Sequence, residues 1–202
     1  MVEIKFLAEL RARLNTKDQI STNNCESYML LHQFCQKFII PVLINQKATI
    51  SIVELTTCGL LSDILTGESG ASRYFLMGIT PYSSDMKIKL GISPELLKHE
   101  GSGTVSTSTA IALAQRVRVY SKSTIGLAET GMLPSDLKKR RTQKKAGEVH
   151  LAIETATSSI NKKLMIQHDL PRVVMRQGIA FEVLKTLEGF LSSSVLPKSK
   201  DL

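Results

Sequence analysis

The fold is decided by residues 47–61, Lys-Ala-Thr-Ile-Ser-Ile-Val-Glu-Leu-Thr-Thr-Cys-Gly-Leu-Leu. Residues 49–53 are apolar and β-branched apart from one serine, which is typical of a buried strand. Polar residues follow at Glu54, Thr56 and Thr57, and the apolar spacing then becomes helical. A buried strand that leads into a helix predicts a ligand site, because a helix N-terminus offers free N–H groups and partial positive charge. An ordinary connection with Thr56 or Thr57 as the helix cap explains the same residues.

Length and composition indicate one domain with a substantial core, since the chain has 202 residues and a hydrophobic fraction of 43%. No apolar run approaches the roughly 20 residues of a membrane span, and the charged start shows no signal peptide. The three cysteines form no CxxC motif and the four histidines show no metal-ligand spacing. We therefore expect no metal or other cofactor, no membrane partner, and a reducing, cytoplasmic location.

The positive charge of the chain is concentrated in residues 138–145. Without the six basic residues of this segment, the net charge falls from +8 to +2. Basicity confined to one segment argues against a nucleic-acid-binding face, which needs several phosphate contacts from one surface. A nuclear-import signal, an anion-binding patch and a solvated loop all remain open. The basic residues are Lys138, Lys139, Arg140, Arg141, Lys144 and Lys145.

The apolar spacing along the chain predicts alternating helices and strands. Helices are expected at 3–14, 24–44 with a break or bend at Pro41, 58–65, from Asp85 after a Ser83 or Ser84 cap, from Pro94, at 107–120 and at 172–191. Strands are expected at 49–53, 73–82, 123–128, 147–155 and 163–167, with 129–131 as an exit into a loop.

This order predicts a mixed α/β sheet with helices on both faces. Residues 1–23 are expected to form an N-terminal helix and linker, residues 24–192 an α/β domain, and residues 193–202 a polar tail.

The strand-to-helix segment resembles the signature of the CinA C-terminal domain family, the nicotinamide mononucleotide amidohydrolases. In that family the strand ends in Ala-Glu-Ser-Cys-Thr-Gly-Gly. Glu54, Thr57 and Gly59 match its Glu, Thr and second Gly, whereas the serine proposed as the nucleophile falls on Leu55.

The resemblance extends over residues 25–192 in the family's order and spacing. It implies that the chain has the family's α/β fold. The matching stretches are Ser69–Phe75, Tyr82–Lys87, Leu90–Ile92, Gly103–Ser106, Gly147–Val149 and the pair Arg172 and Arg176.

What the resemblance implies for catalysis is mixed. The family hydrolyses the carboxamide of nicotinamide mononucleotide with a serine, and a lysine is implicated in activating that serine. Lys87 and Tyr82 match family residues, but Leu55 has no atom that can attack a carbonyl. The family's Thr-Gly-Ile-Ala-Gly-Pro loop is also altered, because residues 130–134 read Thr-Gly-Met-Leu-Pro and lack one glycine.

A neighbouring side chain could replace the missing serine. Thr56, Thr57 and Cys58 are the candidates, and Cys58 is the best chemically because a helix N-terminus favours its thiolate. A side chain one to three positions away points in another direction unless the backbone shifts.

The candidate site residues follow from this comparison. The catalytic candidates are Lys87 and Tyr82, with Cys58 as a substitute for the nucleophile at the Leu55 position. The ligand-binding candidates are Glu54, Thr57, Gly59, Tyr74, Thr130, Gly131 and Arg172.

We expect a catalytically degenerate member of this family that acts through ligand binding or protein assembly. Its expected partners are a nicotinamide nucleotide and other protein chains, as a homo-oligomer or in a larger complex, and not nucleic acid. One alternative is an active nicotinamide-nucleotide amidase. Another is a nuclear interaction protein that uses residues 138–145.

Overall fold

The computed structural model describes residues 5–14, 24–98, 103–133 and 145–193, and its centre is one five-stranded sheet. The strand order is β2-β1-β3-β4-β5. β1 pairs in parallel with β2 and β3, whereas β3, β4 and β5 are antiparallel neighbours. The predicted mixed sheet is therefore confirmed. The strands are β1 (Ile50–Glu54), β2 (Phe75–Ile79), β3 (Ile125–Gly131), β4 (Glu148–Glu154) and β5 (Ser159–Met165).

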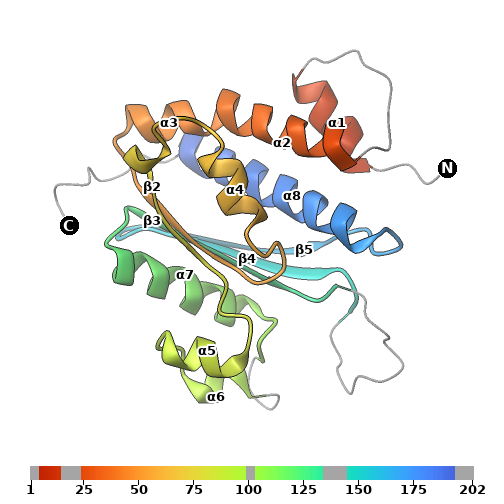
Figure 1. The fold of residues 1–202 in the computed structure, drawn as a ribbon. Coiled ribbons are helices and arrows are strands. Elements are labelled where there is room, and N and C mark those ends of the chain that lie inside the picture. Colours follow the sequence, from red (N-terminus) through yellow and green to blue (C-terminus); the bar gives the residue numbers. More distant parts are fainter. Residues whose placement is uncertain (1–4, 15–23, 99–102, 134–144, 194–202) are drawn as a thin grey trace.

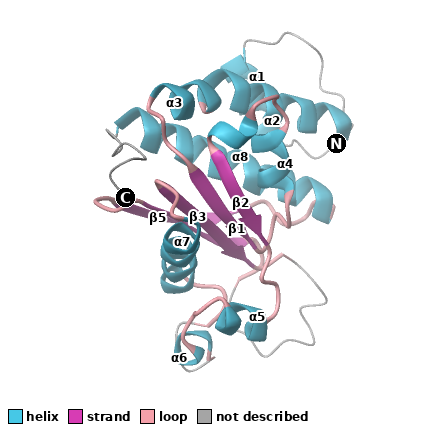
Figure 2. Cartoon of the chain, turned by 60° about the vertical axis from the view of Figure 1, so that its left-hand side comes forward, coloured by secondary structure: helices cyan, strands magenta, loops and turns pink. Residues whose placement is uncertain are grey.

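Helices cover both faces of the sheet, as predicted (Figures 1 and 2). One face carries α1 (Lys5–Leu14), α2 (Asn24–Phe38), α3 (Ile40–Asn45), α4 (Leu60–Thr66) and α8 (Arg172–Ser193). The other carries α7 (Thr107–Ser121), with α5 (Ser84–Lys89) and α6 (Pro94–Leu97) beside its N-terminal end. A 3₁₀ turn, η1 (Ala71–Arg73), precedes β2.

Helix α7 packs directly against the backbone of the sheet. Its predicted buried face is confirmed, since Ala110, Leu113, Ala114 and Val117 are all buried. A Cβ atom at Gly126 of β3 would lie 2.0 Å from the carbonyl oxygen of Ala114. The backbones of α7 and β3 therefore touch, and only glycine fits at position 126.

Two strand predictions were wrong in their limits. Residues 129–131 were expected to leave the sheet, but they continue β3 because Glu129, Thr130 and Gly131 pair with Leu151, His150 and Val149 of β4. The hairpin partner of β4 is residues 159–165 rather than 163–167. β5 is an edge strand whose side chains are mostly exposed, so its polar sequence carries no apolar pattern.

Other boundaries moved by a few residues. The predicted helix 24–44 is interrupted after Phe38, and Pro41 lies in the first turn of the next helix. The predicted strand 73–82 is shorter, because Arg73 lies in η1. Ser83 caps α5 as expected, since its side chain accepts a hydrogen bond from the Met86 amide. The linker, the C-terminal tail and the basic segment, apart from Lys145, lie outside the described residues.

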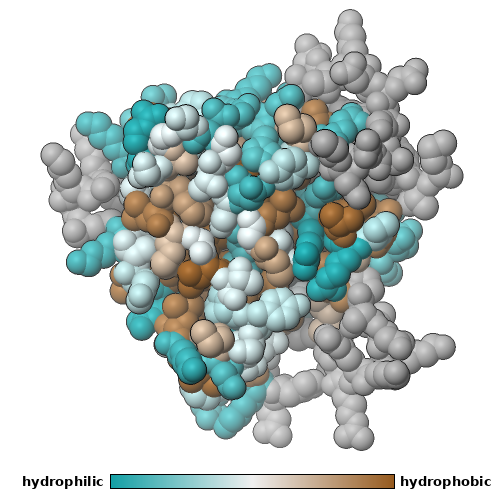
Figure 3. All heavy atoms as spheres, in the orientation of Figure 1, coloured by the Kyte–Doolittle hydropathy of each residue, from teal (hydrophilic) through white to brown (hydrophobic). Residues whose placement is uncertain are grey.

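The surface gives two further observations. None of the helices in the described ranges has the length and apolarity that crossing a membrane requires. The face that carries β2 and α4 shows brown and white side chains among teal ones (Figure 3). Leu76 of β2 is one of the large hydrophobic side chains that are exposed.

Candidate functional site

The turn after β1 is organised by the carboxylate of Glu54. Its two oxygens accept hydrogen bonds from the backbone amides of Gly59, Leu61 and Ser62 at 2.8–3.0 Å, and from the Ser62 hydroxyl at 2.5 Å. These amides belong to the N-terminus of α4, where donors lack partners within the helix. Glu54 therefore caps α4, a role that was expected of Thr56 or Thr57.

A second carboxylate, Glu129 of β3, reaches the same turn from the neighbouring strand. Its Oε1 accepts hydrogen bonds from the amides of Thr56 at 2.7 Å and Thr57 at 2.8 Å. The Thr57 hydroxyl lies 2.9 Å from this oxygen and 2.7 Å from Glu54 Oε2. Glu129 Oε2 has no hydrogen-bond partner among the described residues. Complete burial raises the pKa of Glu129, and the hydrogen bonds from Thr56 and Thr57 only partly oppose this effect.

Replacing Glu129 with glutamine should raise the free energy of unfolding by about 1 kcal/mol at pH 7–8. The glutamine carbonyl can accept the same amide hydrogen bonds, and the buried charge is removed. Because the folded-state pKa of Glu129 is raised, the wild type loses stability as pH rises through that pKa. The difference between the variants should therefore shrink in acid. Urea unfolding of both proteins between pH 4 and pH 8 measures it, and a difference that grows in acid would contradict the assignment.

Cys58, the next residue of the turn, has a backbone conformation that favours glycine. Its φ is +54°, in the left-handed region. Its thiol lies 3.4 Å from the Leu55 carbonyl oxygen and 3.5 Å from Nη2 of Arg176. The side chain is partly exposed, but Cys58 does not line the cavity described below.

The Cys58→Gly variant should be more stable than the wild type by about 0.5–1 kcal/mol. Relief of the left-handed strain outweighs the greater backbone entropy of glycine in the unfolded chain. Chemical denaturation of the two proteins tests this. Lys122→Gly is the matched control, because Lys122 has a similar φ of +57° at the end of α7 and should respond in the same direction. Loss of stability in Cys58→Gly alone would show that the contacts of the thiol with Leu55 and Arg176 outweigh the backbone strain.

A cavity of about 240 Å³ opens beside this turn, between the ends of β1 and β3, the loop before α7 and the start of α8. Among its described lining residues, Lys87 and Arg172 are basic and none is acidic. The cavity therefore suits an anionic or polar ligand. It is lined by Leu55, Thr56, Tyr82, Lys87, Thr104, Val105, Thr130, Gly131, Met132, Leu133 and Arg172.

Lys87 is the buried cation of this cavity, with only 3% of its surface exposed. Its ammonium donates a hydrogen bond of 2.8 Å to the carbonyl oxygen of Tyr82, and no acidic side chain pairs with it among the described residues. Burial lowers the pKa of Lys87. An anionic ligand would supply the charge that this ammonium lacks.

The structure brings together about half of the candidate residues. Tyr82, Lys87, Thr130, Gly131 and Arg172 line the cavity together with the Leu55 position. Glu54, Thr57, Cys58, Gly59 and Tyr74 do not.

Tyr74 has a structural contact instead. Its buried hydroxyl donates a hydrogen bond of 2.8 Å to the Leu65 carbonyl oxygen of α4, and burial raises its pKa to about 12.

Four residues that line the cavity were not among the candidates, namely Thr104, Val105, Met132 and Leu133. Thr56, a candidate replacement for the missing serine, also lines it. Thr104 and Val105 lie in the Gly103–Ser106 stretch that resembles the family, so that stretch could have indicated them. Met132 and Leu133 occupy the altered loop. The sequence predicts Glu129 at the exit of a strand into a loop, but Glu129 lies within β3. An acid directly after an apolar segment hints at a polar site without identifying its partners.

The chemistry available at residue 55 is limited. Leu55 is 8% exposed and presents an apolar side chain to the cavity. Within the described parts of the chain, no cluster of three or more His, Cys, Asp or Glu side chains is placed to hold a metal ion. The arrangement can bind and orient an anion, but residue 55 cannot form a covalent intermediate.

Solved structures of the same fold are known from several bacteria. The competence/damage inducible protein CihA from Agrobacterium tumefaciens superposes with a TM-score of 0.72 and 23% identity, over 87% of this chain and 100% of that one. The competence damage-inducible protein ComA from Klebsiella pneumoniae gives a TM-score of 0.73 at 16% identity, over 81% of this chain and 98% of that one. The chain therefore shares the fold of these two bacterial proteins.

Sequence comparison gives the family directly. The CinA C-terminal domain family matches residues 32–191, and the chain belongs to this family. A CinA-like protein of Koribacter versatilis is 45% identical over 87 residues, covering 43% of this chain and 21% of that protein. A CinA-like protein of Frankia casuarinae is 32% identical over 136 residues, covering 67% of this chain and 30% of that protein. The chain thus spans less than half the length of these relatives.

Proposed function

We propose that this chain binds a nicotinamide nucleotide in the cavity beside Leu55 and does not hydrolyse it through residue 55. One observation supports the proposal: Leu55, which matches the family's nucleophile in the resemblance, presents an apolar side chain to a cavity that Lys87, Arg172 and several polar residues also line. The protein would then act as a ligand-binding, catalytically degenerate member of the family.

The charge and shape of the cavity support binding of such a ligand. Lys87 and Arg172 can contact a phosphate, and the hydroxyl of Tyr82 can donate to or accept from ligand oxygens. The volume of about 240 Å³ lies just below the range of roughly 300–1,000 Å³ that ligand sites span, so the cavity would enclose only part of a nucleotide.

The test is a pair of measurements on the purified protein with nicotinamide mononucleotide. Isothermal titration calorimetry should detect binding, and an ammonia-release assay should detect no turnover. The Leu55→Ser variant is assayed beside the wild type, because it restores a hydroxyl at the family's nucleophile position. Activity only in Leu55→Ser would show a site that lacks nothing but its nucleophile.

Two results would contradict the proposal. Ammonia release by the wild type would mean that another residue attacks the carboxamide. Failure of nicotinamide mononucleotide to bind at millimolar concentration would remove the proposed ligand. Nicotinamide riboside is the matched control ligand, since it lacks the phosphate and should bind more weakly if Lys87 and Arg172 contact that group.

A second candidate function is an active amidase that uses Thr56. The observation that favours it is the position of Thr56, which directly follows Leu55, lines the cavity and has a hydroxyl with no hydrogen-bond partner among the described residues. Glu129 approaches it from β3. In this case the wild type would release ammonia and Thr56→Val would not. Thr57→Val is the control, because Thr57 does not line the cavity, and it should still release ammonia.

A further inference from the structure

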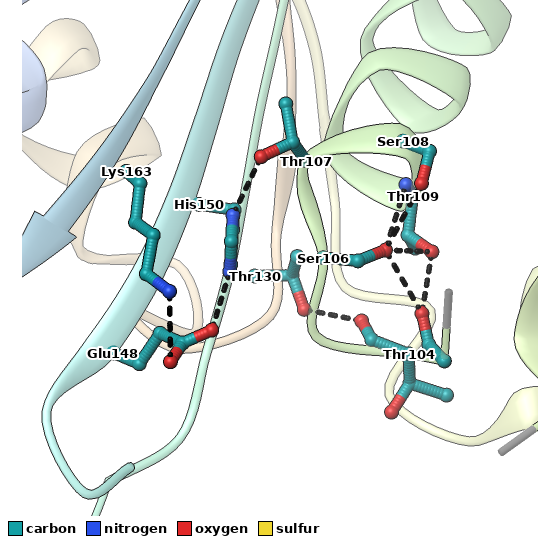
Figure 4. A network of polar contacts seen from close by, with 10 residues as sticks. Thr104, Ser106, Thr107, Ser108, Thr109, Thr130, Glu148, His150 and Lys163 are labelled. Carbon is teal, nitrogen blue, oxygen red and sulfur yellow. Dashed lines mark hydrogen bonds and ion pairs between the residues drawn. The ribbon is translucent and has the colours of Figure 1, made fainter. Parts of the chain in front are cut away.

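A second group of reactive side chains lies outside the Leu55 cavity, where α7 begins against the sheet (Figure 4). Thr107 is the first residue of α7, and His150 and Glu148 lie on β4. Lys163 of β5 is the cross-strand partner of His150. Thr107 and Glu148 reach the two ring nitrogens of His150 from opposite ends, so that the four side chains form one continuous chain.

The distances in this chain are those of full hydrogen bonds. Thr107 Oγ1 lies 2.8 Å from His150 Nδ1, and Glu148 Oε1 lies 2.8 Å from His150 Nε2. Glu148 Oε2 is 3.1 Å from the ammonium of Lys163. Burial opposes ionisation of Glu148, but the hydrogen bonds from His150 and Lys163 outweigh it and hold its pKa below the ordinary value.

The direction of each hydrogen bond follows from the chemistry of the groups. An ionised Glu148 can only accept, so Nε2 of His150 carries a proton and donates it. In the neutral ring, Nδ1 then has a lone pair and accepts a hydrogen bond from the Thr107 hydroxyl. A hydroxyl, an imidazole and a carboxylate in this order have the polarity of a nucleophile, its base and the group that orients the base.

The burial of these groups suits the same roles. His150 is only 5% exposed, so its ring is shielded from water, whereas Thr107 is partly exposed. The helix cap is supplied by another residue, because the Ser106 side chain accepts the Thr109 amide at 3.1 Å. The Thr107 hydroxyl is therefore not consumed in capping α7.

We propose that Thr107 is a nucleophile toward acyl donors, such as carboxylic esters and thioesters, with His150 as its base and Glu148 as the positioning residue. The Thr107 oxygen attacks the carbonyl carbon, and its proton passes to His150 Nδ1. The bond to the leaving group breaks, and the same proton passes to the leaving oxygen or sulfur. Water then hydrolyses the acyl-threonine, with His150 again accepting and returning a proton.

This centre is separate from the Leu55 cavity, although the two are close. Thr130, which lines the cavity, is the cross-strand partner of His150, and its hydroxyl donates to the Thr104 carbonyl oxygen at 2.7 Å. None of Thr107, His150 and Glu148 lines the cavity. Binding of a nucleotide and acylation of Thr107 can therefore be tested independently.

The experiment uses p-nitrophenyl acetate as the acyl donor. Release of p-nitrophenolate gives the rate, and peptide mapping by mass spectrometry locates the acetyl group. We expect acetylation at Thr107 in the wild type and in Thr107→Ser, and none at this position in Thr107→Val. His150→Gln should slow acetylation about 100-fold. Ser108→Ala is the matched control on the same turn of α7 and should react like the wild type.

The competing explanation is a purely structural link between α7 and the sheet. It predicts that residue 107 is acetylated no faster than an ordinary exposed hydroxyl, and equally fast in His150→Gln. Either result would overturn the proposal. If His150→Gln does not fold, Glu148→Gln replaces it, since this variant leaves the ring in place while removing the negative charge that orients it. Loss of nucleotide binding has no bearing on this outcome, because that readout belongs to the Leu55 cavity.

Discussion

Replacing Glu54 with alanine is expected to lower the free energy of unfolding by about 3–5 kcal/mol. The carboxylate accepts hydrogen bonds from three backbone amides and the Ser62 hydroxyl. Alanine leaves these donors without acceptors at the N-terminus of α4, where Leu61 is fully buried. Urea denaturation followed by circular dichroism measures the change.

Two variants make the Glu54 test specific. Glu95→Ala is the control, because Glu95 is 74% exposed and pairs with Lys98 three residues later on the surface. It should change stability by less than about 0.5 kcal/mol. The stability of Glu54→Gln should lie between those of Glu54→Ala and Glu95→Ala. The amide keeps one acceptor oxygen, but its NH₂ group faces the remaining donors. A Glu54→Ala variant as stable as Glu95→Ala would show that water can replace the cap.

The Lys87→Met variant should bind nicotinamide mononucleotide about 100-fold more weakly than the wild type, a loss of about 2.7 kcal/mol. Methionine fills similar space without the ammonium that we expect to contact the phosphate. The free protein should not be destabilised, because burial already disfavours the charged form of Lys87. Calorimetric titration gives the affinity, and urea denaturation gives the stability.

Lys89→Met, an exposed position on the same helix, is the matched control and should bind normally. The pH dependence provides a second check. Since the pKa of Lys87 is lowered, its positive charge is lost at a lower pH than that of an ordinary lysine. Affinity in the wild type should therefore fall as pH rises through this pKa, and Lys87→Met should show no such fall. Equal affinities of Lys87→Met and Lys89→Met would exclude Lys87 from the ligand site.

Much of the fold could be predicted from the sequence because its buried elements have strong patterns. The strand 49–53 is apolar and β-branched, and the buried face of α7 repeats at helical spacing. β5 lacked such a signal, because an edge strand packs mainly on one face and its exposed residues are polar. Its limits depend on pairing with β4, and no local preference records that pairing.

Lys87, Tyr82 and Arg172 could be predicted as site residues because they lie in stretches that resemble the family, and all three line the cavity. Glu129 could not be placed in the same way, because its role depends on amides that lie more than seventy positions earlier in the chain. The chain of Thr107, His150 and Glu148 was missed for the same reason. β4 brings His150 beside the start of α7, and the spacing in the sequence gives no indication of that contact.

The contact between Gly126 and the Ala114 carbonyl oxygen has a consequence for how the molecule adapts to a ligand. Because the two backbones are in direct contact, α7 cannot slide along β3 without first moving away from it. We therefore expect the wall of the cavity beside the start of α7, with Thr104 and Val105, to move little when a ligand binds. We expect any induced fit on the opposite side, where Tyr82, Lys87 and Arg172 belong to α5, α8 and the segments before them. The ligand would be enclosed by movement of one wall against a fixed one.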